Sequence, residues 1–342
     1  MRVLIINSDG YQDMGFVTEA AAEASLVDAL RRAEVDVEVT RVASVEALEA
    51  ALDGLPGDTL VWPNAYHVGP DARSLQAVIE ARGLPIVGSP APTLELVLHK
   101  ERCQARLAAA GVPVPPFAVV TRADLDAVAT AARSLRFPII VKPTATAGSL
   151  GIDRRSVVDT IDAAAAAVAR VLDEHGPPAL LEEYLPSNDI TFAVFLRGDA
   201  RRVVATWYEM TDRPPGSTVL ERCDRLRAWG GPKRMRLVED PALLDEISAL
   251  APRVCEALGV RDFTRIDGRR DRDGRLRVFD VNGLPALDFP ESVIVRQAIV
   301  ACAPEGERRA FDRLIRTIVA CAAHRCGLRA PPAIERDALF AA

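Results

Sequence analysis

Short apolar runs alternate with helical patterns through about the first 90 residues, and this alternation limits the fold more than any other feature. The apolar runs are residues 3–6, 35–42, 59–62 and 85–88, and the helical patterns are residues 18–33, 45–52 and 72–82. Strands that alternate with helices are typical of a parallel sheet with helices on its faces. Because ligands of such sheets bind where the strands end, we expect residues 7–10 and 63–67 to line a mouth.

The length and charge of the chain narrow its organisation and its partners. With 342 residues, it is long enough for two or three domains. The formal net charge of −6 argues against nucleic acid as the main partner, because phosphate binding needs a basic surface. No apolar run approaches membrane-spanning length, so no membrane partner is expected.

Six widely spaced cysteines suggest a reducing compartment, and we expect a cytoplasmic protein. Cys321, His324 and Cys326 lie close together in the sequence. Their spacing matches no common zinc pattern, so a structural zinc site is not expected.

Beyond residue 90 the pattern changes from alternating α/β to mixed α+β. The expected elements are helices at 93–110, 160–175, 242–258 and 311–326, strands at 190–196 and 203–208, and a hairpin at 263–282. The arginine-rich segment 209–236 shows no clear periodicity, and we expect it to be irregular. The tail from residue 330 is expected to be a loose surface segment.

The hairpin contains an Asp-Gly dipeptide at 273–274, which is a strong signal for a two-residue turn. That turn would place Asp267 directly opposite Asp280 and Arg265 directly opposite Asn282. Side chains two residues apart share a face of a strand, so the four side chains would converge on one patch.

Two opposed carboxylates destabilise a bare sheet, whereas a hard divalent cation would reverse the effect. Carboxylates and an amide oxygen are ligands that magnesium prefers, and a neighbouring arginine suits a carboxylate or a transferring phosphate. The opposite face of the hairpin would carry the apolar residues Ile266, Phe279 and Val281. The alternative is a solvated charged hairpin in which Arg265 pairs with Asp267 or Asp280.

Only three of the 42 basic residues are lysines, and two of them lie in segments that suit nucleotide phosphates. A lysine retained among so many arginines favours a position that needs a compact, flexible ammonium. Lys142 opens a segment in which Gly148 and Gly151 allow backbone amides to approach phosphates and Ser149 can add a hydroxyl donor. Lys100 opens a helical stretch, and the third lysine is Lys233. Codon bias explains the lysine count equally well when that count is taken alone.

An alternating apolar and acidic segment at 180–185 is followed by Asp189. The pattern suits an adenine slot with an acceptor for ribose. An ordinary amphipathic strand end explains the same pattern when the segment stands alone.

Together, these segments resemble the ATP-grasp superfamily and, within it, the D-alanine–D-alanine ligase-like branch. The resemblance extends from residue 1 to about residue 329 and depends on the order and spacing of motifs. The motifs are residues 84–89, Lys100, 138–152, 182–185, Asp189, 265–267 and 280–285. The resemblance implies α/β and α+β parts: an N-terminal parallel α/β domain at 1–92, a central lobe at 93–185, a C-terminal lobe at 186–330 and a tail at 331–342. ATP would be clamped between the two α+β lobes.

The resemblance also implies roles for individual residues. The phosphate contacts would be Lys100, Lys142, Gly148 and Ser149. The adenine would be framed by Glu182, Glu183 and Leu185, and the ribose would be bound by Asp189. Magnesium or manganese would be held by Asp267, Asp280 and Asn282. The catalytic residues would be Arg265, Lys142 and Ser149, with Arg265 stabilising the developing negative charge.

Enzymes of this type phosphorylate a carboxylate with ATP and let an amine attack the acylphosphate, releasing ADP and phosphate. The expected partners are therefore a small-molecule carboxylate and a small-molecule amine, and the resemblance also implies a homodimer. Two alternatives stay open. The acylphosphate could be captured by a thiol or by an internal amine that cyclises the product, or the protein could bind nucleotide without catalysis.

Two positions depart from the pattern of D-alanine ligases. Val17 lies nearest the position where those ligases hold the first amine with a glutamate, and Glu19 could replace that glutamate only with a shift of register. Glu291 lies near the position of a serine that grips the acceptor carboxylate, and an acid there would repel a carboxylate and attract an amine. We therefore expect an amide product other than D-alanyl-D-alanine.

Further substrate contacts are expected from a lid at 209–236, which contains Arg213 and Lys233, and from His67 at the mouth. Such a lid would capture an acidic substrate as it closes. A solvated loop and a surface histidine account for the same residues equally well.

Overall fold

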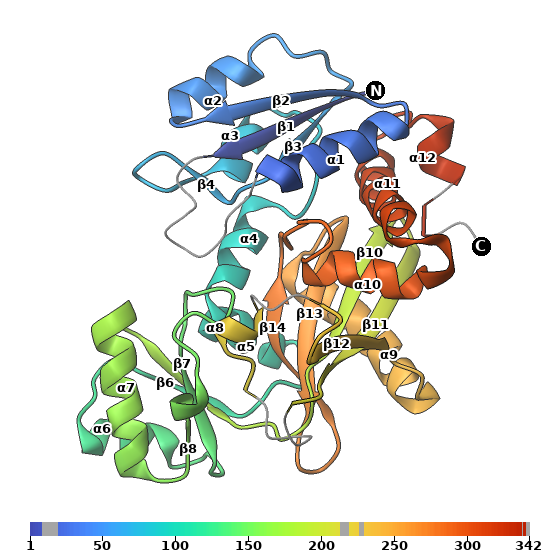
Figure 1. The fold of residues 1–342 in the computed structure, drawn as a ribbon. Coiled ribbons are helices and arrows are strands. Elements are labelled where there is room, and N and C mark those ends of the chain that lie inside the picture. The colour runs from blue at the N-terminus through green and yellow to red at the C-terminus, as the bar shows by residue number, and fades with distance from the viewer. Residues whose placement is uncertain (9–19, 213–218, 226–228, 337, 340–342) are drawn as a thin grey trace.

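The computed structural model describes residues 1–8, 20–212, 219–225, 229–336 and 338–339. Within these residues the strands form a three-stranded, a four-stranded and a five-stranded sheet, together with one two-stranded hairpin. Figure 1 shows the three-stranded sheet at the top, the four-stranded sheet at the lower left and the five-stranded sheet near the centre. No helix of the described segments has the length and apolarity needed to cross a membrane.

The three-stranded N-terminal sheet is parallel, as the alternation of strands and helices predicted. Its strands are β1 (Arg2–Ser8), β2 (Asp36–Val42) and β3 (Thr59–Pro63), in the order β2-β1-β3. The helices of this part are α1 (Ala20–Arg32), α2 (Val45–Leu52) and α3 (Leu75–Ala81). Near the strand ends, Asn64 Nδ2 donates to Asn7 Oδ1 at 2.8 Å, so the described parts of the two segments of the expected mouth lie together, while residues 9 and 10 lie outside the described residues.

Two boundaries in this part differ from the prediction. Residues 72–74 are not helical, because β4 (His67–Val68) and β5 (Arg73–Ser74) form a short hairpin before α3. The Ser74 side chain then accepts a hydrogen bond from the first turn of α3 and caps it. Residues 85–88 form an isolated parallel bridge to β3 instead of the predicted strand.

The sequence predicts one continuous helix after residue 93, but the structure contains two, α4 (Ala91–Leu98) and α5 (Lys100–Ala109). The helices are separated at His99, whose backbone is extended with φ −104° and ψ 96°. The backbone N–H of Lys100 donates to the carbonyl oxygen of Thr144 at 3.0 Å. No proline or glycine marks the break, so a contact with a distant segment sets it.

The four-stranded sheet is antiparallel, in the order β6-β9-β7-β8. Its strands are β6 (Phe117–Val120), β7 (Ile139–Pro143), β8 (Val157–Val158) and β9 (Ala179–Glu183), and its helices are α6 (Leu125–Ala132) and α7 (Ile161–His175). Helix α7 is the predicted alanine-rich helix. It begins where the Thr160 side chain accepts a hydrogen bond from the backbone N–H of Ala163.

The five-stranded sheet is antiparallel, in the order β12-β11-β10-β13-β14. Its strands are β10 (Ile190–Arg197), β11 (Ala200–Met210), β12 (Lys233–Leu237), β13 (Phe263–Arg270) and β14 (Leu276–Asn282). The helices of this part are α8 (Arg222–Arg225), α9 (Pro241–Leu258), α10 (Val293–Ala301), α11 (Glu307–Arg325) and α12 (Pro332–Arg336). Ile266 and Val281 of the hairpin lie in the core beside α9, as predicted.

Three predictions for this part are wrong. The segment 209–236 is not wholly irregular, because it contains α8 and most of β12, which pairs Lys233 with Met210. The closing helix α11 begins four residues earlier than predicted, and α10 was not predicted. The tail is not loose at Ile334, whose side chain is fully buried against α11.

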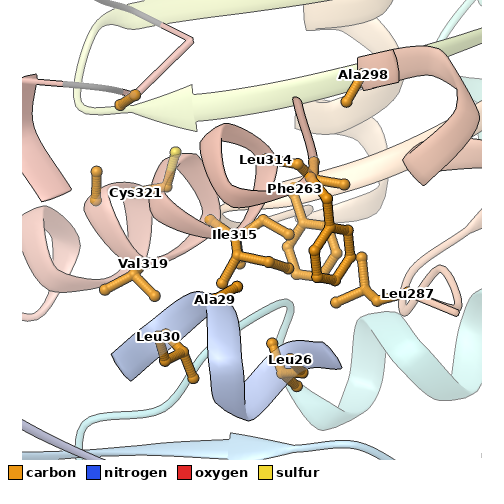
Figure 2. Close-up of a cluster of buried hydrophobic side chains, with 14 of the residues drawn as sticks. Leu26, Ala29, Leu30, Phe263, Leu287, Ala298, Leu314, Ile315, Val319 and Cys321 are labelled. Atoms are coloured by element: carbon orange, nitrogen blue, oxygen red, sulfur yellow. The ribbon is translucent and has the colours of Figure 1, made fainter. Parts of the chain in front are cut away.

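The N-terminal sheet and the five-stranded sheet share one apolar core, which is shown in Figure 2. Leu26 and Leu30 of α1 lie opposite Ile315 and Val319 of α11, and Phe263 of β13 lies beside them. The ion pair between Asp262 and Arg325 lies at the same contact, where Asp262 also accepts from the backbone N–H of Gly88 at 2.7 Å and Arg325 donates to the carbonyl oxygen of Ile86. Both carboxylate oxygens of Asp262 accept hydrogen bonds from Arg325 at 2.7 Å.

Candidate active site

The β13–β14 hairpin brings the predicted metal-binding residues together, although its turn differs from the prediction. Arg265 faces Asn282 and Asp267 faces Asp280 across the strand pair, as predicted. The strands are joined by five residues, 271–275, so the predicted two-residue turn is wrong. A five-residue connection alone would shift the register by one residue, and a compensating irregularity must therefore lie between the turn and the site.

That irregularity is a β-bulge at Phe279. The register shifts between Asp267 and Gly268, which leaves Phe279 as an extra residue of β14. A Cβ atom on Gly268 would lie 2.7 Å from the carbonyl oxygen of Arg277, so only glycine allows the strands to approach this closely. The bulge turns Phe279 into the cleft, and the prediction that it faces the opposite side is wrong.

Asp267 is buried and its carboxylate is fully engaged. Oδ1 accepts from Thr191 Oγ1 at 2.6 Å and from Arg265 Nε at 3.1 Å. Oδ2 accepts from an Arg265 amino group at 2.8 Å and lies 3.4 Å from Asn282 Nδ2. Burial alone would lower the pKa of Arg265, but the Asp267 carboxylate outweighs burial and raises that pKa. Arg265 is thus a fixed cation in the wall of the cleft.

Asp280 differs from Asp267 in its surroundings. It lines the cleft with Asn282 and Arg265, and no hydrogen bond or ion pair from another described residue reaches its carboxylate. Within the described segments, no group of three or more His, Cys, Asp or Glu side chains is arranged to hold a metal. An ion at this place would therefore depend on the amide oxygen of Asn282 as well as on carboxylates.

The three side chains considered for zinc are separated by their positions on and after α11. Cys321 is fully buried in the core. His324 is exposed and lies over the turn between β10 and β11, where its ring would contact a Cβ atom on Gly198. Cys326 lies near the carbonyl oxygen of Ile86.

All three lysines are buried and line the cleft, and two of them, Lys100 and Lys142, lie near the loop that follows β7. Lys142 Nζ is 2.7 Å from Glu182 Oε2, and both side chains are at most 5% exposed. The Lys142 ammonium also lies 5.4 Å from the centre of the Phe279 ring. Lys100 Nζ donates to the carbonyl oxygen of Thr146. Both ammonium groups are held at one end of the loop that follows β7.

Gly148 and Ser149 form the turn of that loop. Both have φ of +60°, in the left-handed region that favours glycine. Both line the cleft beside Lys100 and Lys142. The left-handed pair turns the backbone around this end of the cleft, as expected of a loop that receives phosphates.

A mainly apolar slot continues the cleft. Its apolar walls are Ile140, Ile152, Leu185, Val219, Leu220 and Phe279. Glu182, Glu183 and Asp189 also line it, as the sequence predicted for an adenine and ribose site. The slot shares Lys142, Ser149, Ile152 and Phe279 with the larger cavity, so the two form one continuous cleft.

The acids of the slot already have protein partners. Glu183 accepts from the backbone N–H of Arg136 at 2.9 Å and from its Nε at 3.2 Å. Asp189 accepts from the guanidinium of Arg269, which also donates to the carbonyl oxygen of Leu185 at 3.1 Å. Arg269 was not predicted, although it lies two residues beyond Asp267 on the same strand.

The remaining predicted substrate residues are distributed unevenly. Lys233 and Glu291 line the cleft, and Lys233 Nζ lies 4.1 Å from the centre of the Trp229 ring. His67 is not among the residues that line the described cleft, and burial lowers its pKa. Its neighbour Tyr66 lines the cleft instead. Glu19 and Arg213 lie outside the described residues.

Gln104 was missed by the sequence interpretation and Phe279 was assigned to the wrong face, whereas Tyr66 belongs to the segment 63–67 that was expected at the mouth. The Tyr66 hydroxyl accepts from the backbone N–H of Leu284 at 3.0 Å, two residues beyond Asn282 of the predicted metal site. Phe279 owes its place to the bulge, which no local pattern signals. Gln104 is buried behind the cleft, where it contacts Glu182 and Phe279.

Comparison with known proteins agrees with this geometry. The family described as D-ala D-ala ligase C-terminus matches residues 107–293, more than half of the chain. The D-alanine–D-alanine ligase of Stutzerimonas stutzeri is 28% identical over 219 residues, which cover 64% of this chain and 65% of that protein. The match therefore spans about two thirds of that relative's length. The D-alanine–D-alanine ligase of Gluconobacter oxydans is 29% identical over 283 residues, which cover 82% and 86% of the two chains.

Solved structures show the same fold. The D-alanine–D-alanine ligase from Bacillus anthracis superposes with a TM-score of 0.70 at 16% identity, covering 96% of this chain and 99% of that one. The VanG D-Ala:D-Ser ligase from Enterococcus faecalis superposes with a TM-score of 0.64 at 18% identity, covering 93% and 99%. The chain thus has the ATP-grasp fold and belongs to the D-alanine–D-alanine ligase family.

Proposed function

We propose that this protein is an ATP- and magnesium-dependent ligase that joins a carboxylate to an amine and releases ADP and phosphate. One observation carries the proposal: a single cleft brings two buried lysines and a left-handed glycine-serine turn to the same place as Asp280, Asn282 and Arg265. The family and its relatives' names support the same reaction class.

ATP would occupy the cleft along its length. The adenine would enter the apolar slot beside Glu182, Glu183 and Leu185, and the ribose would meet Asp189 and Arg269. The phosphates would then reach the lysine end. Phosphoryl transfer depends mainly on positioning and on cancellation of charge, and Lys100, Lys142 and the backbone around Gly148 and Ser149 supply both.

The donor set of the hairpin fits a hard divalent cation. Asp280 has a carboxylate that no described side chain pairs with, and the Asn282 amide oxygen lies on the same face. Asp267 lies directly opposite Asp280 on the paired strand and would be a third ligand. Magnesium or manganese held there would neutralise charge on the phosphate oxygens. Arg265 would stabilise the charge that develops on the transferring group.

The charged residues at the far end of the cleft indicate which substrates could bind there. Asp288 and Glu291 line this end, and Lys233 lies nearby over Trp229. Two acids would repel the carboxylate of a second D-alanine and attract an amine. We therefore propose an amide product other than D-alanyl-D-alanine, with a small-molecule amine as the acceptor.

A screen for ADP formation tests the function. Purified protein with ATP and magnesium would be supplied with pairs of carboxylates and amines, and products would be identified by mass. We expect ADP only when both substrates are present. Robust turnover with D-alanine alone would overturn the proposed product, and absence of heat from ATP plus magnesium in a calorimetric titration would overturn the function. Products that contain a thioester or a ring would instead favour capture of the acylphosphate by a thiol or an internal amine.

We also propose that the chain is organised as domains at 1–92, 93–185 and 186–330, and that it forms a homodimer. Limited proteolysis would test the boundaries. Sedimentation velocity would test the dimer.

A further inference from the structure

Gln104 links the two walls of the nucleotide slot from behind. It lies on α5 and is 1% exposed. Its amide nitrogen donates to Glu182 Oε1 on β9 and to the carbonyl oxygen of Phe279 on β14 at 3.1 Å. Both partners are acceptors, so the amide nitrogen and not the amide oxygen must face them.

Glu182 and Phe279, the two partners of Gln104, both lie beside Lys142 inside the cleft. Glu182 uses its other oxygen, Oε2, to hold Lys142 Nζ at 2.7 Å. The same ammonium lies 5.4 Å from the centre of the Phe279 ring, at the bulge. The contacts therefore form a closed circuit from Gln104 through Glu182 and Lys142 to Phe279. This circuit spans the four-stranded and the five-stranded sheets.

The chemistry of the circuit calls for a neutral donor at position 104. A carboxylate there would place a like charge beside Glu182 and compete for Lys142. An ammonium would compete with Lys142 for Glu182. An apolar side chain would leave two buried acceptors without a donor. Glutamine supplies two donors and no charge, so the charge of Glu182 stays directed at Lys142.

Packing alone does not explain this residue. The oxygen Oε1 of Gln104 is buried and has no hydrogen-bond partner in the described part of the chain. A buried acceptor without a partner is unfavourable, so an apolar residue would avoid that cost at a site that only needed packing.

We propose that Gln104 is a positioning residue that sets the orientation of Lys142 toward nucleotide phosphates by acting through Glu182 and the Phe279 bulge. The inference rests on the proposed binding of ATP in the cleft. Gln104 itself touches neither nucleotide nor substrate. Lys142 faces the phosphates, whereas Glu182 and Phe279 also line the slot proposed for adenine, so the loss of affinity should be larger for ATP and ADP than for the nucleoside.

The test compares Gln104→Met, which keeps the shape of the side chain, with Gln104→Glu, which adds a charge. The matched control is Gln76→Met. Gln76 is also 1% exposed, donates to a backbone carbonyl, that of Ser89, at 2.7 Å and has an unpartnered Oε1 in the described residues, but it lies away from the cleft. Dissociation constants for ATP and ADP with magnesium would be measured by calorimetry, and that for adenosine by ligand-observed NMR. Melting temperatures would be measured in parallel.

We expect Gln104→Met to weaken the binding of ATP and of ADP about tenfold, which corresponds to about 1.4 kcal/mol. The dissociation constant for adenosine should change by no more than about twofold. Gln104→Glu should weaken the binding of ATP and of ADP at least as much. Gln76→Met should change none of the three dissociation constants. Equal loss for adenosine and ADP, or unchanged ATP affinity in both variants, would overturn the positioning role. Wild-type protein that binds no ATP would instead refute the proposed function itself.

Discussion

The bulge in the β13–β14 hairpin leads to a prediction about Gly268. Replacing Gly268 with alanine would place a Cβ atom 2.7 Å from the carbonyl oxygen of Arg277 and 3.1 Å from a methyl carbon of Leu276. The first neighbour is backbone of the paired strand, which cannot rotate away. Restoring an ordinary contact of 3.4 Å requires a displacement of about 0.7 Å, and the displaced strand leads directly to Phe279 and Asp280.

The size of the effect follows from this displacement. Overpacking of this kind costs about 1–3 kcal/mol of unfolding free energy. A misplacement of about 1 Å in a catalytic site lowers the reaction rate by up to about 100-fold. We therefore expect the smaller shift of about 0.7 Å to weaken magnesium-dependent ATP binding about tenfold. Urea unfolding measures the change in unfolding free energy. Calorimetric titration with ATP, in magnesium and in EDTA, measures the change in ATP binding.

The matched control is Gly57→Ala, because a Cβ atom there meets nothing within 4 Å and the backbone needs no left-handed conformation. It should change the unfolding free energy by at most about 0.5 kcal/mol and leave ATP binding unchanged. If Gly268→Ala kept both the wild-type stability and the wild-type magnesium-dependent affinity, the reasoning that ties glycine to the bulge and the bulge to the site would be refuted.

Three further predictions concern single carboxylates. Asp280→Ala should lower ADP formation by about 100-fold or more with little change in melting temperature, and retained turnover would place the metal elsewhere. Asp262→Ala should cost about 1–3 kcal/mol in urea unfolding, because it leaves the backbone N–H of Gly88 without its acceptor and the partly exposed Arg325 guanidinium without its ion pair; a loss below about 0.5 kcal/mol would contradict this. Burial raises the pKa of Asp271, but hydrogen bonds from Arg277 and from backbone N–H groups of the turn outweigh burial and lower it. This carboxylate therefore stabilises the folded state above its unfolded pKa, near 3.8, and that stability is lost as the pH falls through the lower folded pKa. Asp271→Asn should remove this part of the acid dependence when unfolding free energies are measured between pH 7 and pH 3, and an unchanged profile would contradict it.

The bounds of α2 were predicted correctly because they depend on nearby residues. The Ser44 side chain caps the helix by accepting a hydrogen bond from the backbone N–H of Ala47. The apolar residues of α2 are spaced so that they lie on one face of the helix. The parallel N-terminal sheet was predicted for a similar reason, because the apolar residues recur with a different period in a strand and in a helix.

The pairing of Asp267 with Asp280 was predicted correctly, but by cancellation of two errors. The turn is longer than the Asp-Gly dipeptide indicated, which would shift the pairing by one residue. The bulge at Phe279 shifts it back. The glycine at position 268 marks a close approach of backbones, but its meaning depends on the partner strand, which the sequence does not identify.

The amino-acid sequence by itself determined the order of strands and helices and the kinds of side chain available for phosphate and metal, because periodicity and capping act over a few neighbouring residues. Only the tertiary structure decided where these side chains meet. The break at His99, the Asp189–Arg269 pair and the place of Gln104 behind Lys142 all depend on contacts between segments far apart in the chain. Burial and hydrogen bonding across such contacts can outweigh local preference, and this is why a helix expected to continue ends where Lys100 turns toward the cleft.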